Sequence, residues 1–344
     1  MSALSGIYGR VVRARRAWYE QPHRQHHLVR PVVSIGNLVV GGSGKTPAVA
    51  AVTRILQDLG ERPAILSRGY GRRSEAALVV VSDGHGPLVG VADSGDEPQM
   101  LARSLPGAVL VVGADRHKAG HWAETHLDAT VHVLDDGFQH VRLARDVDLL
   151  MMSVNDLTER VLPTGRLREP VEAAEAADAV LVQGSHADRV RVQAALNART
   201  VFEVVPTSAP LRDLHPFGGV SASGPGRVVA VAGIARPERF FAGLTASGFE
   251  IASALTFRDH HWFDQRDVQR IQDVARAAGT SLVVTTEKDA VRLEPFVAAQ
   301  ASGPDAVHWT YQPYQVRVEP DATFRAWLAE RLAAARQRRA TRSA

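Results

Sequence analysis

The sequence of 344 residues contains no cysteine. This absence excludes a disulfide framework, thiolate-bound zinc, an iron–sulfur cluster and a cysteine nucleophile. Long hydrophobic runs are also missing, since no apolar stretch approaches the roughly 18 to 20 residues that span a bilayer. The N-terminus lacks the apolar segment and small-residue cleavage site of a secretory signal. We therefore expect any metal to be held by oxygen or imidazole ligands, and the protein to stay in the cytosol or on a membrane face exposed to it.

The chain also has little net charge, because 40 lysine and arginine residues oppose 37 acidic residues and leave a formal charge of +3. Its content of 45% hydrophobic and 22% charged residues is typical of a folded soluble protein and excludes a disordered or collagen-like chain. At roughly 100 to 200 residues per domain, the length predicts two domains, or one large domain with an appendage.

Both ends of the chain are nonetheless basic. Residues 331–342 are rich in arginine, and before residue 31 a single acid, Glu20, stands against Arg10, Arg13, Arg15, Arg16, Arg24 and Arg30. The segment 5–20 predicts a helix that mixes these arginines with apolar and aromatic side chains. Such a helix suits the plane of a membrane surface, where arginines meet anionic lipid. The alternative is a helix packed on its own domain with solvated arginines, and the residues alone leave both open.

From Pro31 onward, short β-branched runs alternate with segments of helical composition. The runs are residues 32–35, 64–66, 77–81, 108–112, 131–134, 147–152, 179–182, 228–231 and 281–285. This alternation predicts an α/β fold with a doubly wound, mostly parallel sheet covered on both faces by helices. A stretch rich in Pro, Gly and Ser at 211–225 predicts a boundary between a core domain, residues 31–215, and a smaller α/β domain, residues 226–335.

A glycine-rich turn follows the first strand and opens a helix. Its residues are Val39, Val40, Gly41, Gly42, Ser43, Gly44, Lys45 and Thr46. Strand, glycine-rich turn and helix in this order predict a phosphate-binding P-loop, in which Lys45 bridges the β- and γ-phosphates and the Thr46 hydroxyl ligates Mg²⁺. The strict pattern requires glycine where Val39 stands, so a turn that merely caps a helix is the alternative.

Two carboxylates, Asp135 and Asp136, end the β-run 131–134. Adjacent like charges repel unless a cation lies between them, so this pair predicts a metal site near the P-loop. The alternative is a pair of turn-forming residues.

Other charged residues stand where the alternation places loops. Asp96 and Glu97 precede a helix, where either could act as a base or metal contact or could simply cap the helix. Arg116 follows a strand, and Arg166 and Arg168 lie in a loop flanked by Pro and Gly. Arginine binds phosphate in a bidentate manner, although solvated surface arginines are the alternative.

A histidine pair, His260 and His261, follows Asp259 in the smaller predicted domain. An aspartate beside a histidine can orient a general base, but such pairs are more often structural. For the segment 285–289, which ends a strand and starts a helix, we predict only capping.

The combination of motifs is specific. The segments are 34–37, 41–47, 67–71, 95–98, 114–116, 134–140, 165–169 and 259–260, with Asp-Asp-Gly-Phe-Gln-His at 135–140 as the most distinctive. On these segments the chain resembles the tetraacyldisaccharide 4′-kinase family, the lipid A 4′-kinases, nearly from end to end. The resemblance implies transfer of phosphate from ATP to the 4′-hydroxyl of a tetraacylated glucosamine disaccharide 1-phosphate, forming the bis-phosphorylated lipid A precursor.

The resemblance also implies residue roles. Asp96 is implied as the base, assisted by His260, and Lys45 and Thr46 bind phosphate and Mg²⁺. Implied for the metal and substrate environment are Asp135, Asp136 and Glu97, and for steering phosphate Arg116, Arg166 and Arg168, with Gln139 and His140 beside them. The residues alone choose neither Asp96 over Glu97 nor His260 over His261.

The implied setting is the cytoplasmic face of the inner membrane of a Gram-negative bacterium. Residues 1–30 would form a peripheral membrane-docking helix, because the segment is short and rich in arginine. The expected cofactors are ATP and Mg²⁺, and the expected partner is the lipid substrate, with no nucleic acid and no obligate protein partner.

Two other classes fit part of the sequence. A GTP-dependent switch or metallochaperone would use the same loop, but its guanine-selecting Asn-Lys-x-Asp motif is missing, since Asn37, Asn155 and Asn197 are not followed by lysine. A soluble P-loop kinase for a small sugar or nucleoside is the nearer alternative, but it would not need basic, aromatic ends.

Overall fold

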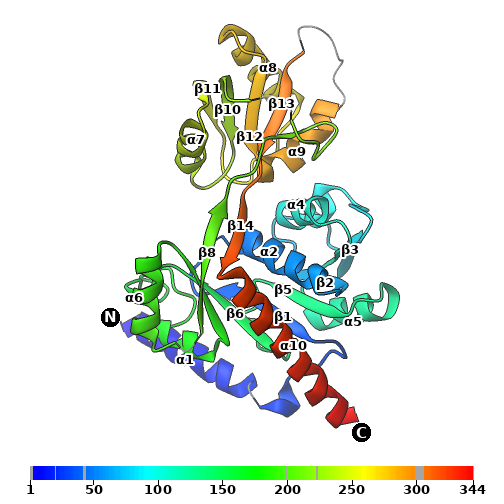
Figure 1. The fold of residues 1–344 in the computed structure, drawn as a ribbon, viewed down its shortest axis with the longest axis vertical. Coiled ribbons are helices and arrows are strands. Elements are labelled where there is room, and N and C mark those ends of the chain that lie inside the picture. Colours follow the sequence, from blue (N-terminus) through cyan, green and yellow to red (C-terminus); the bar gives the residue numbers. More distant parts are fainter. Residues whose placement is uncertain are drawn as a thin grey trace.

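The computed structural model describes residues 3–19, 21–41, 44–198, 200–221, 224–298 and 306–343, so Gly42 and Ser43 of the predicted P-loop lie outside the described residues. The described chain forms two sheets, one above the other along the long axis of the molecule (Figure 1). Within these residues the large sheet has nine strands in the order β14-β8-β7-β6-β1-β5-β2-β4-β3, and the small sheet has five in the order β11-β10-β12-β13-β9.

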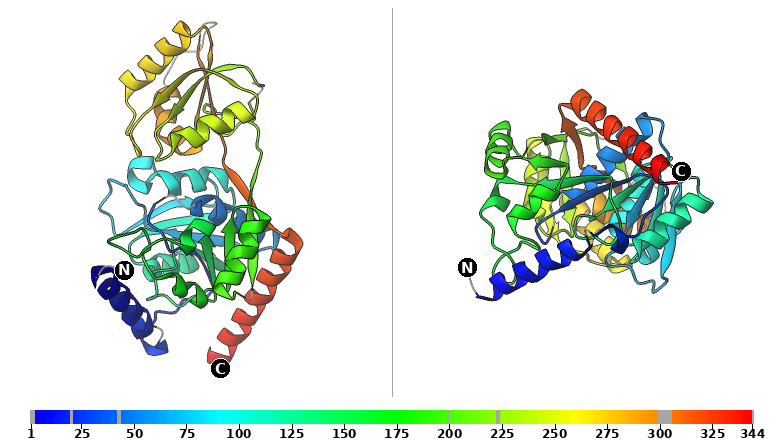
Figure 2. Two further views of the ribbon diagram at one scale, coloured as in Figure 1. Left: turned by 90° about the vertical axis from the view of Figure 1, so that its left-hand side faces the viewer. Right: turned by 90° about the horizontal axis from the view of Figure 1, so that it is seen from below.

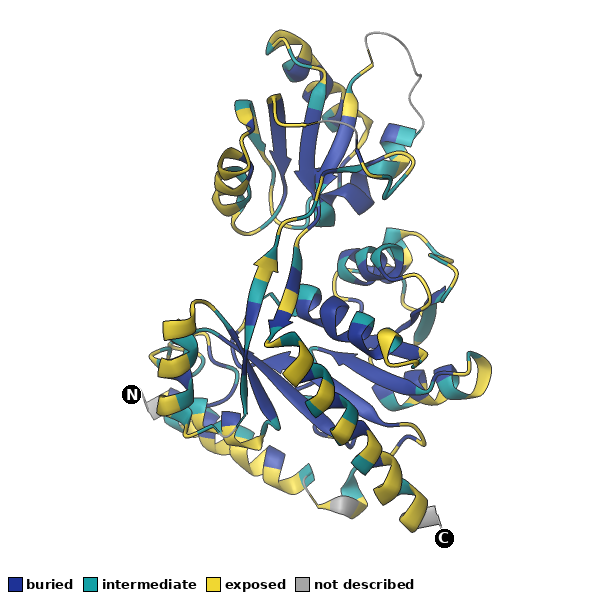
Figure 3. Cartoon of the chain, in the orientation of Figure 1, coloured by how far each residue is buried: buried dark blue, intermediate teal, exposed yellow. Residues whose placement is uncertain are grey.

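The large sheet is mostly parallel. Its parallel strands are β1 (Val32–Asn37), β2 (Pro63–Ser67), β4 (Val109–Gly113), β5 (Val131–Asp135), β6 (Val147–Met152), β7 (Ala179–Gln183) and β8 (Val201–Thr207). Two edge strands, β3 (Leu78–Asp83) and β14 (Gln315–Glu319), pair antiparallel. The central strands are buried at every position, as expected for a parallel sheet covered on both faces (Figure 3).

Alternation along β1 explains this burial. Val33 and Ile35 point to one face and pack with α2 (Lys45–Asp58), α4 (Asp96–Ser104) and α10 (Asp321–Ser343). Val32 points to the opposite face, which is covered by α5 (Arg116–His126) and, over β6 and β7, by α6 (His186–Leu196). The remaining helical segments of this part are α1 (Ala3–Tyr19), α3 (Val91–Ser94), η1 (Pro22–Arg24), η2 (Val154–Leu157) and η3 (Val171–Ala176).

The small sheet repeats the same architecture. Parallel strands β10 (Arg227–Ala232), β11 (Glu250–Thr256), β12 (Leu282–Thr286) and β13 (His308–Gln312) are extended by the antiparallel β9 (Arg212–Asp213). Helices α8 (Gln265–Ala277) and α9 (Glu287–Ala298) cover one face, and α7 (Pro237–Ala246) covers the other. The predicted α/β class, with a large mostly parallel sheet and a second, smaller α/β unit, is confirmed.

The sheets do not divide the chain where the composition predicts. Strand β9 at 212–213 belongs to the small sheet, although we predicted residues 31–215 for the core domain. Residues 315–343 return to the large sheet, although we predicted 226–335 for the smaller domain: β14 pairs with β8, and Phe324, Leu328 and Leu332 of α10 are buried in the large core. Alternation of Val316 and Val318 with charged residues suits this edge, but composition does not say which sheet a strand joins.

Helix α1 lies with α10 at the end of the large domain farthest from the small sheet (Figure 2). Its outer face exposes four large apolar side chains, Leu4, Ile7, Val11 and Trp18, each more than half accessible to solvent. No helix in the part of the chain that the structure describes combines the length and the apolarity needed to cross a bilayer.

Strand β1 packs closely against the segment that contains Phe138, and this contact leads to a prediction for stability. At Gly36 of β1, an added Cβ would lie 2.4 Å from the Cβ and 2.6 Å from the backbone nitrogen of Phe138. We expect Gly36→Ala to lower the free energy of unfolding by about 1–3 kcal/mol, since neither backbone can yield. Urea unfolding measures this change. The control, Gly243→Ala in exposed α7, meets no atom within 4 Å and should be neutral or stabilising. Equal losses in both variants would contradict the prediction.

Candidate active site

The predicted phosphate loop is fixed at its base by Asn37, the last residue of β1. The Asn37 side-chain amide donates to the Val39 carbonyl at 2.9 Å, and its oxygen accepts from Lys45 Nζ at 2.8 Å. Gly44 caps α2 with a φ of 72°, a left-handed conformation that favours glycine. The loop is thus held at both ends, with Lys45 at the start of α2.

The loop 165–169 runs beside this turn. Val40 donates its N–H to the Arg166 carbonyl at 2.8 Å, and Arg168 donates its N–H to the Leu38 carbonyl at 2.6 Å. The exposed Arg166 guanidinium also donates to the Val40 carbonyl at 2.9 Å. These contacts place Arg166 beside the predicted phosphate loop, but they commit the Val40 N–H to a protein carbonyl.

Asp136 lies between two predicted phosphate-binding cations. Its carboxylate pairs with Lys45 at 3.2 Å and with Arg168 at 2.8 Å. Burial alone would raise the pKa of Asp136, but these two cations outweigh it and hold the pKa below its ordinary value. Gln139 completes the group, because it accepts from Arg168 at 3.2 Å and donates to the Asn37 carbonyl at 3.0 Å. The structure therefore brings together Lys45, Asp136, Gln139 and Arg168.

Asp135, by contrast, lies in an excess of negative charge. Burial and the carboxylates of Glu97 and Asp136 raise the pKa of Asp135 to about 6, against the opposing hydrogen bond from Ser67 Oγ at 2.9 Å. An oxygen-only donor set with excess negative charge suits a hard divalent cation. The described residues contain no group of three or more acidic or histidine side chains that could hold a metal alone. Carboxylate oxygens are ligands of the kind that Mg²⁺ takes, and phosphate and water commonly supply its other ligands.

Arg116 lies close enough to Asp135 and Asp136, and His140 close enough to Arg116, for their charges to interact. Arg116 is only 3% exposed, and burial, together with nearby Arg68, lowers its pKa to about 10 although Asp135 and Asp136 oppose this. Its Nη1 donates to the carbonyls of Gly113 and Ala114 at 3.1 and 3.2 Å. Burial and the charge of Arg116 also lower the pKa of His140 to about 4. His140 is therefore uncharged near neutral pH.

The second predicted group joins the two sheets. Asp96, the first residue of α4, and His260, after β11, are 164 positions apart, yet Asp96 Oδ2 and His260 Nδ1 lie 2.8 Å apart. His260 has a φ of 61°, which turns the chain sharply at this point. Asp96 is 2% exposed and its neighbour Glu97 acts on Asp135, so this pair adjoins the acidic part of the site.

The structure also distinguishes between the two histidines. His261 pairs with Asp267 at 2.7 Å, and its ring packs against Phe257 and Phe263. His261 is thus a structural residue of the small domain, while His260 faces Asp96.

Two further residues contact the Asp96–His260 pair, and the sequence had given no role to either. Arg292 donates from Nε and Nη2 to Asp96 Oδ1, both at 2.5 Å, and Lys288 Nζ lies 3.2 Å from His260 Nε2. For residues 285–289 we predicted capping alone. The available signal was two cations four positions apart at the start of a helix that follows a strand, a spacing that puts both on one helix face.

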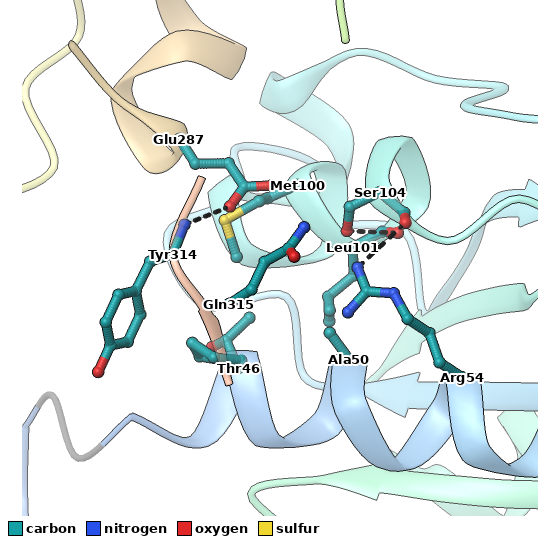
Figure 4. Close-up of a pocket in the computed structure, with 10 residues that line it drawn as sticks. Thr46, Ala50, Arg54, Met100, Leu101, Ser104, Glu287, Tyr314 and Gln315 are labelled. Atoms are coloured by element: carbon teal, nitrogen blue, oxygen red, sulfur yellow. Dashed lines mark hydrogen bonds between the residues drawn. The ribbon is translucent and has the colours of Figure 1, made fainter. Parts of the chain in front are cut away.

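Thr46 is buried beside a small pocket between the two sheets, where Figure 4 shows side chains from α2, α4 and the start of α9. Glu287 enters this pocket from the small domain and accepts the Tyr314 N–H at 3.3 Å. Burial raises the pKa of Glu287 to about 7, although the Tyr314 N–H and the charge of Arg54 oppose the change. The pocket therefore holds a carboxyl group that titrates near neutral pH.

The N-terminal helix is joined to the site by a buried ion pair. Arg16 donates to both oxygens of Glu169, at 2.9 and 3.1 Å, and to the Phe138 carbonyl at 3.2 Å. Its guanidinium also lies over the Phe138 ring. Helix α1 is thus fixed to the segment that follows Asp136 and to the loop that carries Arg168.

Known proteins match this chain over most of its length. The model of the family LpxK, tetraacyldisaccharide-1-P 4′-kinase, matches residues 1–333. The chain is 40% identical over 304 residues to a tetraacyldisaccharide 4′-kinase of Geobacter metallireducens, covering 87% of this chain and 89% of that protein. It is 41% identical over 308 residues to one of Geobacter sulfurreducens, covering 86% and 84%. It also resembles a crystal structure of LpxK from Aquifex aeolicus in complex with ATP, with a TM-score of 0.77, 28% identity and coverage of 96% and 97%.

The raised pKa of Glu287 generates a prediction for the pH dependence of stability. Because this pKa lies above its ordinary value of 4.5, folding favours the protonated acid. The stability that protonation provides is present below about pH 4.5 and is lost as pH rises through about 7. Glu287→Gln resembles the protonated acid, so at pH 8 it should be more stable than the parent by on the order of 2 kcal/mol, with little difference at pH 4.5.

Urea unfolding at pH 4.5, 6 and 8 measures this difference. Glu250→Gln serves as the control, because Glu250 is an exposed carboxylate of the same domain, and it should follow the parent at every pH. A Glu287→Gln variant that loses stability in parallel with the parent would contradict the prediction.

Proposed function

The chain belongs to the tetraacyldisaccharide-1-P 4′-kinase family, and on this premise we propose how its residues divide the work of the reaction. The protein is an ATP-dependent lipid A 4′-kinase, which phosphorylates the 4′-hydroxyl of a tetraacyldisaccharide 1-phosphate. This membership confirms the resemblance that the motifs indicated. It excludes the two alternative functions, a soluble small-molecule kinase and a GTP-dependent switch. The observation that carries the proposed roles is the contact between Asp96 and His260.

Residues 39–46 form the proposed binding site for the triphosphate of ATP. Lys45 neutralises charge on the β- and γ-phosphates. In the structure its ammonium group pairs with the Asp136 carboxylate, which occupies the proposed place of a phosphate oxygen. The proposed Mg²⁺ ligands are the Thr46 hydroxyl and Asp135, with Asp136 and Glu97 acting on the metal directly or through water. When bound, Mg²⁺ supplies neutralisation of phosphate charge, and the excess negative charge around Asp135 supports its placement here.

The transfer step needs an acceptor for one proton. The 4′-hydroxyl oxygen forms a bond to the γ-phosphorus, and the bond from that phosphorus to the β,γ-bridging oxygen breaks, leaving ADP with the electron pair. The hydroxyl proton passes to the Asp96–His260 pair, which we propose as the general base. Asp96 lies in α4 of the large domain and His260 in a turn of the small domain, so we also propose that the smaller domain completes the site by closing over it.

The anionic groups of both substrates need positively charged partners. We assign Arg116, Arg166 and Arg168 to phosphate oxygens, since a guanidinium holds two oxygens at once and stays charged. Gln139 and uncharged His140 are assigned hydrogen bonds at the same place, where an extra positive charge is not required.

Helix α1 is the proposed contact with the membrane. Each buried CH₂ group stabilises a lipid by about 0.8 kcal/mol, so a tetraacylated substrate stays in the bilayer and the enzyme must reach it there. The exposed stripe of Leu4, Ile7, Val11 and Trp18, flanked by arginines, fits a headgroup layer. We propose peripheral attachment to the cytoplasmic face of the inner membrane of a Gram-negative bacterium.

A transfer assay tests the reaction and its base together. With labelled ATP and tetraacyldisaccharide 1-phosphate in mixed micelles, we expect Asp96→Asn to lower kcat by about 10²–10⁴-fold with little change in KM for ATP. Asp93→Asn, an exposed carboxylate three positions earlier, is the control and should keep full activity. A folded Asp96→Asn variant with unchanged kcat would rule out the base. Failure of the parent protein, with ATP bound, to transfer phosphate would overturn the assigned substrate.

Vesicle sedimentation tests the membrane contact. A triple variant, Leu4→Ser, Ile7→Ser and Val11→Ser, should bind vesicles containing phosphatidylglycerol at least tenfold more weakly, because three apolar side chains no longer enter the headgroup layer. The control replaces two exposed apolar residues elsewhere, Leu88→Ser and Val190→Ser, and should bind like the parent. Both variants should phosphorylate detergent-dispersed substrate equally. Unchanged vesicle binding by the triple variant would exclude α1 as the contact.

A further inference from the structure

Helix α9 of the small domain lies against α4 of the large domain (Figure 1). From its first two turns it presents two cations to the Asp96–His260 pair, Lys288 to the imidazole and Arg292 to the carboxylate. Their spacing of four residues places both on one face of the helix. One rigid element of the small domain therefore contacts both members of the proposed base.

Arg292 controls the orientation of the carboxylate. Its Nε and Nη2 both donate to Asp96 Oδ1 at 2.5 Å, while Nη1 donates to the His261 carbonyl at 2.6 Å. The guanidinium is 3% exposed and lies over the Trp262 ring, so it cannot rotate freely. With Oδ1 held in this way, Oδ2 is the oxygen that faces His260.

Lys288 selects the tautomer of the imidazole. An ammonium group has only donors, so at 3.2 Å His260 Nε2 must be the acceptor. The proton of the neutral ring is then on Nδ1, where it is donated to Asp96 Oδ2 at 2.8 Å. Both contacts of the ring select the same tautomer.

We propose that Arg292 and Lys288 are positioning residues for phosphate transfer, which hold Asp96 and His260 in one orientation and one tautomer. This inference rests on the proposed role of that pair as the base. It assigns the proton-accepting atom to His260 Nε2, with Asp96 as the residue that orients the ring. Lys288 has a second partner, Asp259 at 3.3 Å, and is partly exposed, so an anionic substrate group can draw its ammonium away from Nε2.

Proton transfer then balances within the pair. The hydroxyl O–H bond breaks as the oxygen bonds to phosphorus, and an Nε2–H bond forms. The imidazolium produced keeps its Nδ1–H bond to Asp96, whose negative charge stabilises it. Arg292 keeps the carboxylate in place while this happens.

Kinetics of α9 variants in the micelle assay provide the first test. We expect Arg292→Lys to lower kcat at least tenfold with KM for ATP within twofold, because an ammonium cannot make the three contacts of the guanidinium. Lys288→Met should lower kcat by about tenfold, and Lys288→Arg should restore most of the loss, since its guanidinium again offers only donors.

The matched control breaks another ion pair between the same two helices. Arg103 of α4, seven positions after Asp96, pairs with Glu294 of α9 at 3.3 Å. Arg103→Met and Glu294→Gln should lower the melting temperature about as much as Arg292→Lys and leave kcat unchanged. An equal loss of kcat in these controls would mean that Arg292 acts only by stabilising the contact between the two helices, and it would overturn the inference.

Histidine ¹⁵N spectra of the full chain provide a readout that a merely structural role would not move. In the parent, the His260 signal, assigned by its loss in His260→Gln, should show a protonated Nδ1 and an unprotonated Nε2. In Arg292→Met the two shifts should approach each other, because the carboxylate is no longer held at Nδ1. A protonated Nε2 in the parent would overturn the inference.

The outcomes separate the two levels of the proposal. If Asp96→Asn keeps full kcat, the proposed base fails regardless of α9. If Asp96→Asn loses activity and Arg292→Lys keeps it, the positioning role alone fails.

Discussion

A carboxylate withdrawn from water must be paired with a cation, and much of this structure follows from applying that requirement to Asp96. Its partner Arg292 comes from α9 of the small domain, so satisfying the charge also brings α4 and α9 together and sets the position of the His260 turn. Removing one member of such a buried pair typically costs about 3–5 kcal/mol, because it leaves the other charge without compensation. The same contact therefore serves the stability of the interface and the geometry of the proposed chemistry.

The two adjacent acids Asp135 and Asp136 differ in how far their charge is compensated. Asp136 is paired with Lys45 and Arg168, which lower its pKa, whereas Asp135 faces other carboxylates, which together with burial raise its pKa to about 6. The site that we propose for a polyphosphate and a divalent cation needs both conditions. Cations already held by a carboxylate can be exchanged to phosphate, and a carboxylate left short of positive charge attracts the metal. Such unsatisfied charge is a cost to the free protein, and it marks where ligands are expected.

Local patterns predicted much of this site, and their limits are physical. The glycine-rich turn, the acid pair and the strand–helix alternation are each written within a few adjacent residues. The structure confirms the alternation, and it brings the side chains of Lys45 and Asp136 together, whereas Gly42 and Ser43 lie outside the described residues. Asp96 and His260 were assigned as the base from the family resemblance, because the residues alone fitted Glu97 and His261 to that role equally well. Arg292 and Asp96 are 196 positions apart, and Arg16 and Glu169 are 153 apart. Local residue spacing therefore cannot predict either pair. The return of β14 to the large sheet was missed for the same reason, since strand pairing is decided by an edge formed far earlier in the chain.

The return of the chain through β14 also has a consequence for synthesis on the ribosome. The small domain is an insertion between β8 and β14, so the large domain stays incomplete until residues 315–343 have been made. Until then, the face of α2 that β14 covers and the ring of Phe202 that Phe324 covers remain accessible to water. The small domain, whose strands are contiguous in the chain, can finish folding first. The nascent protein thus spends part of its synthesis with a complete small domain and an exposed apolar surface on the large domain.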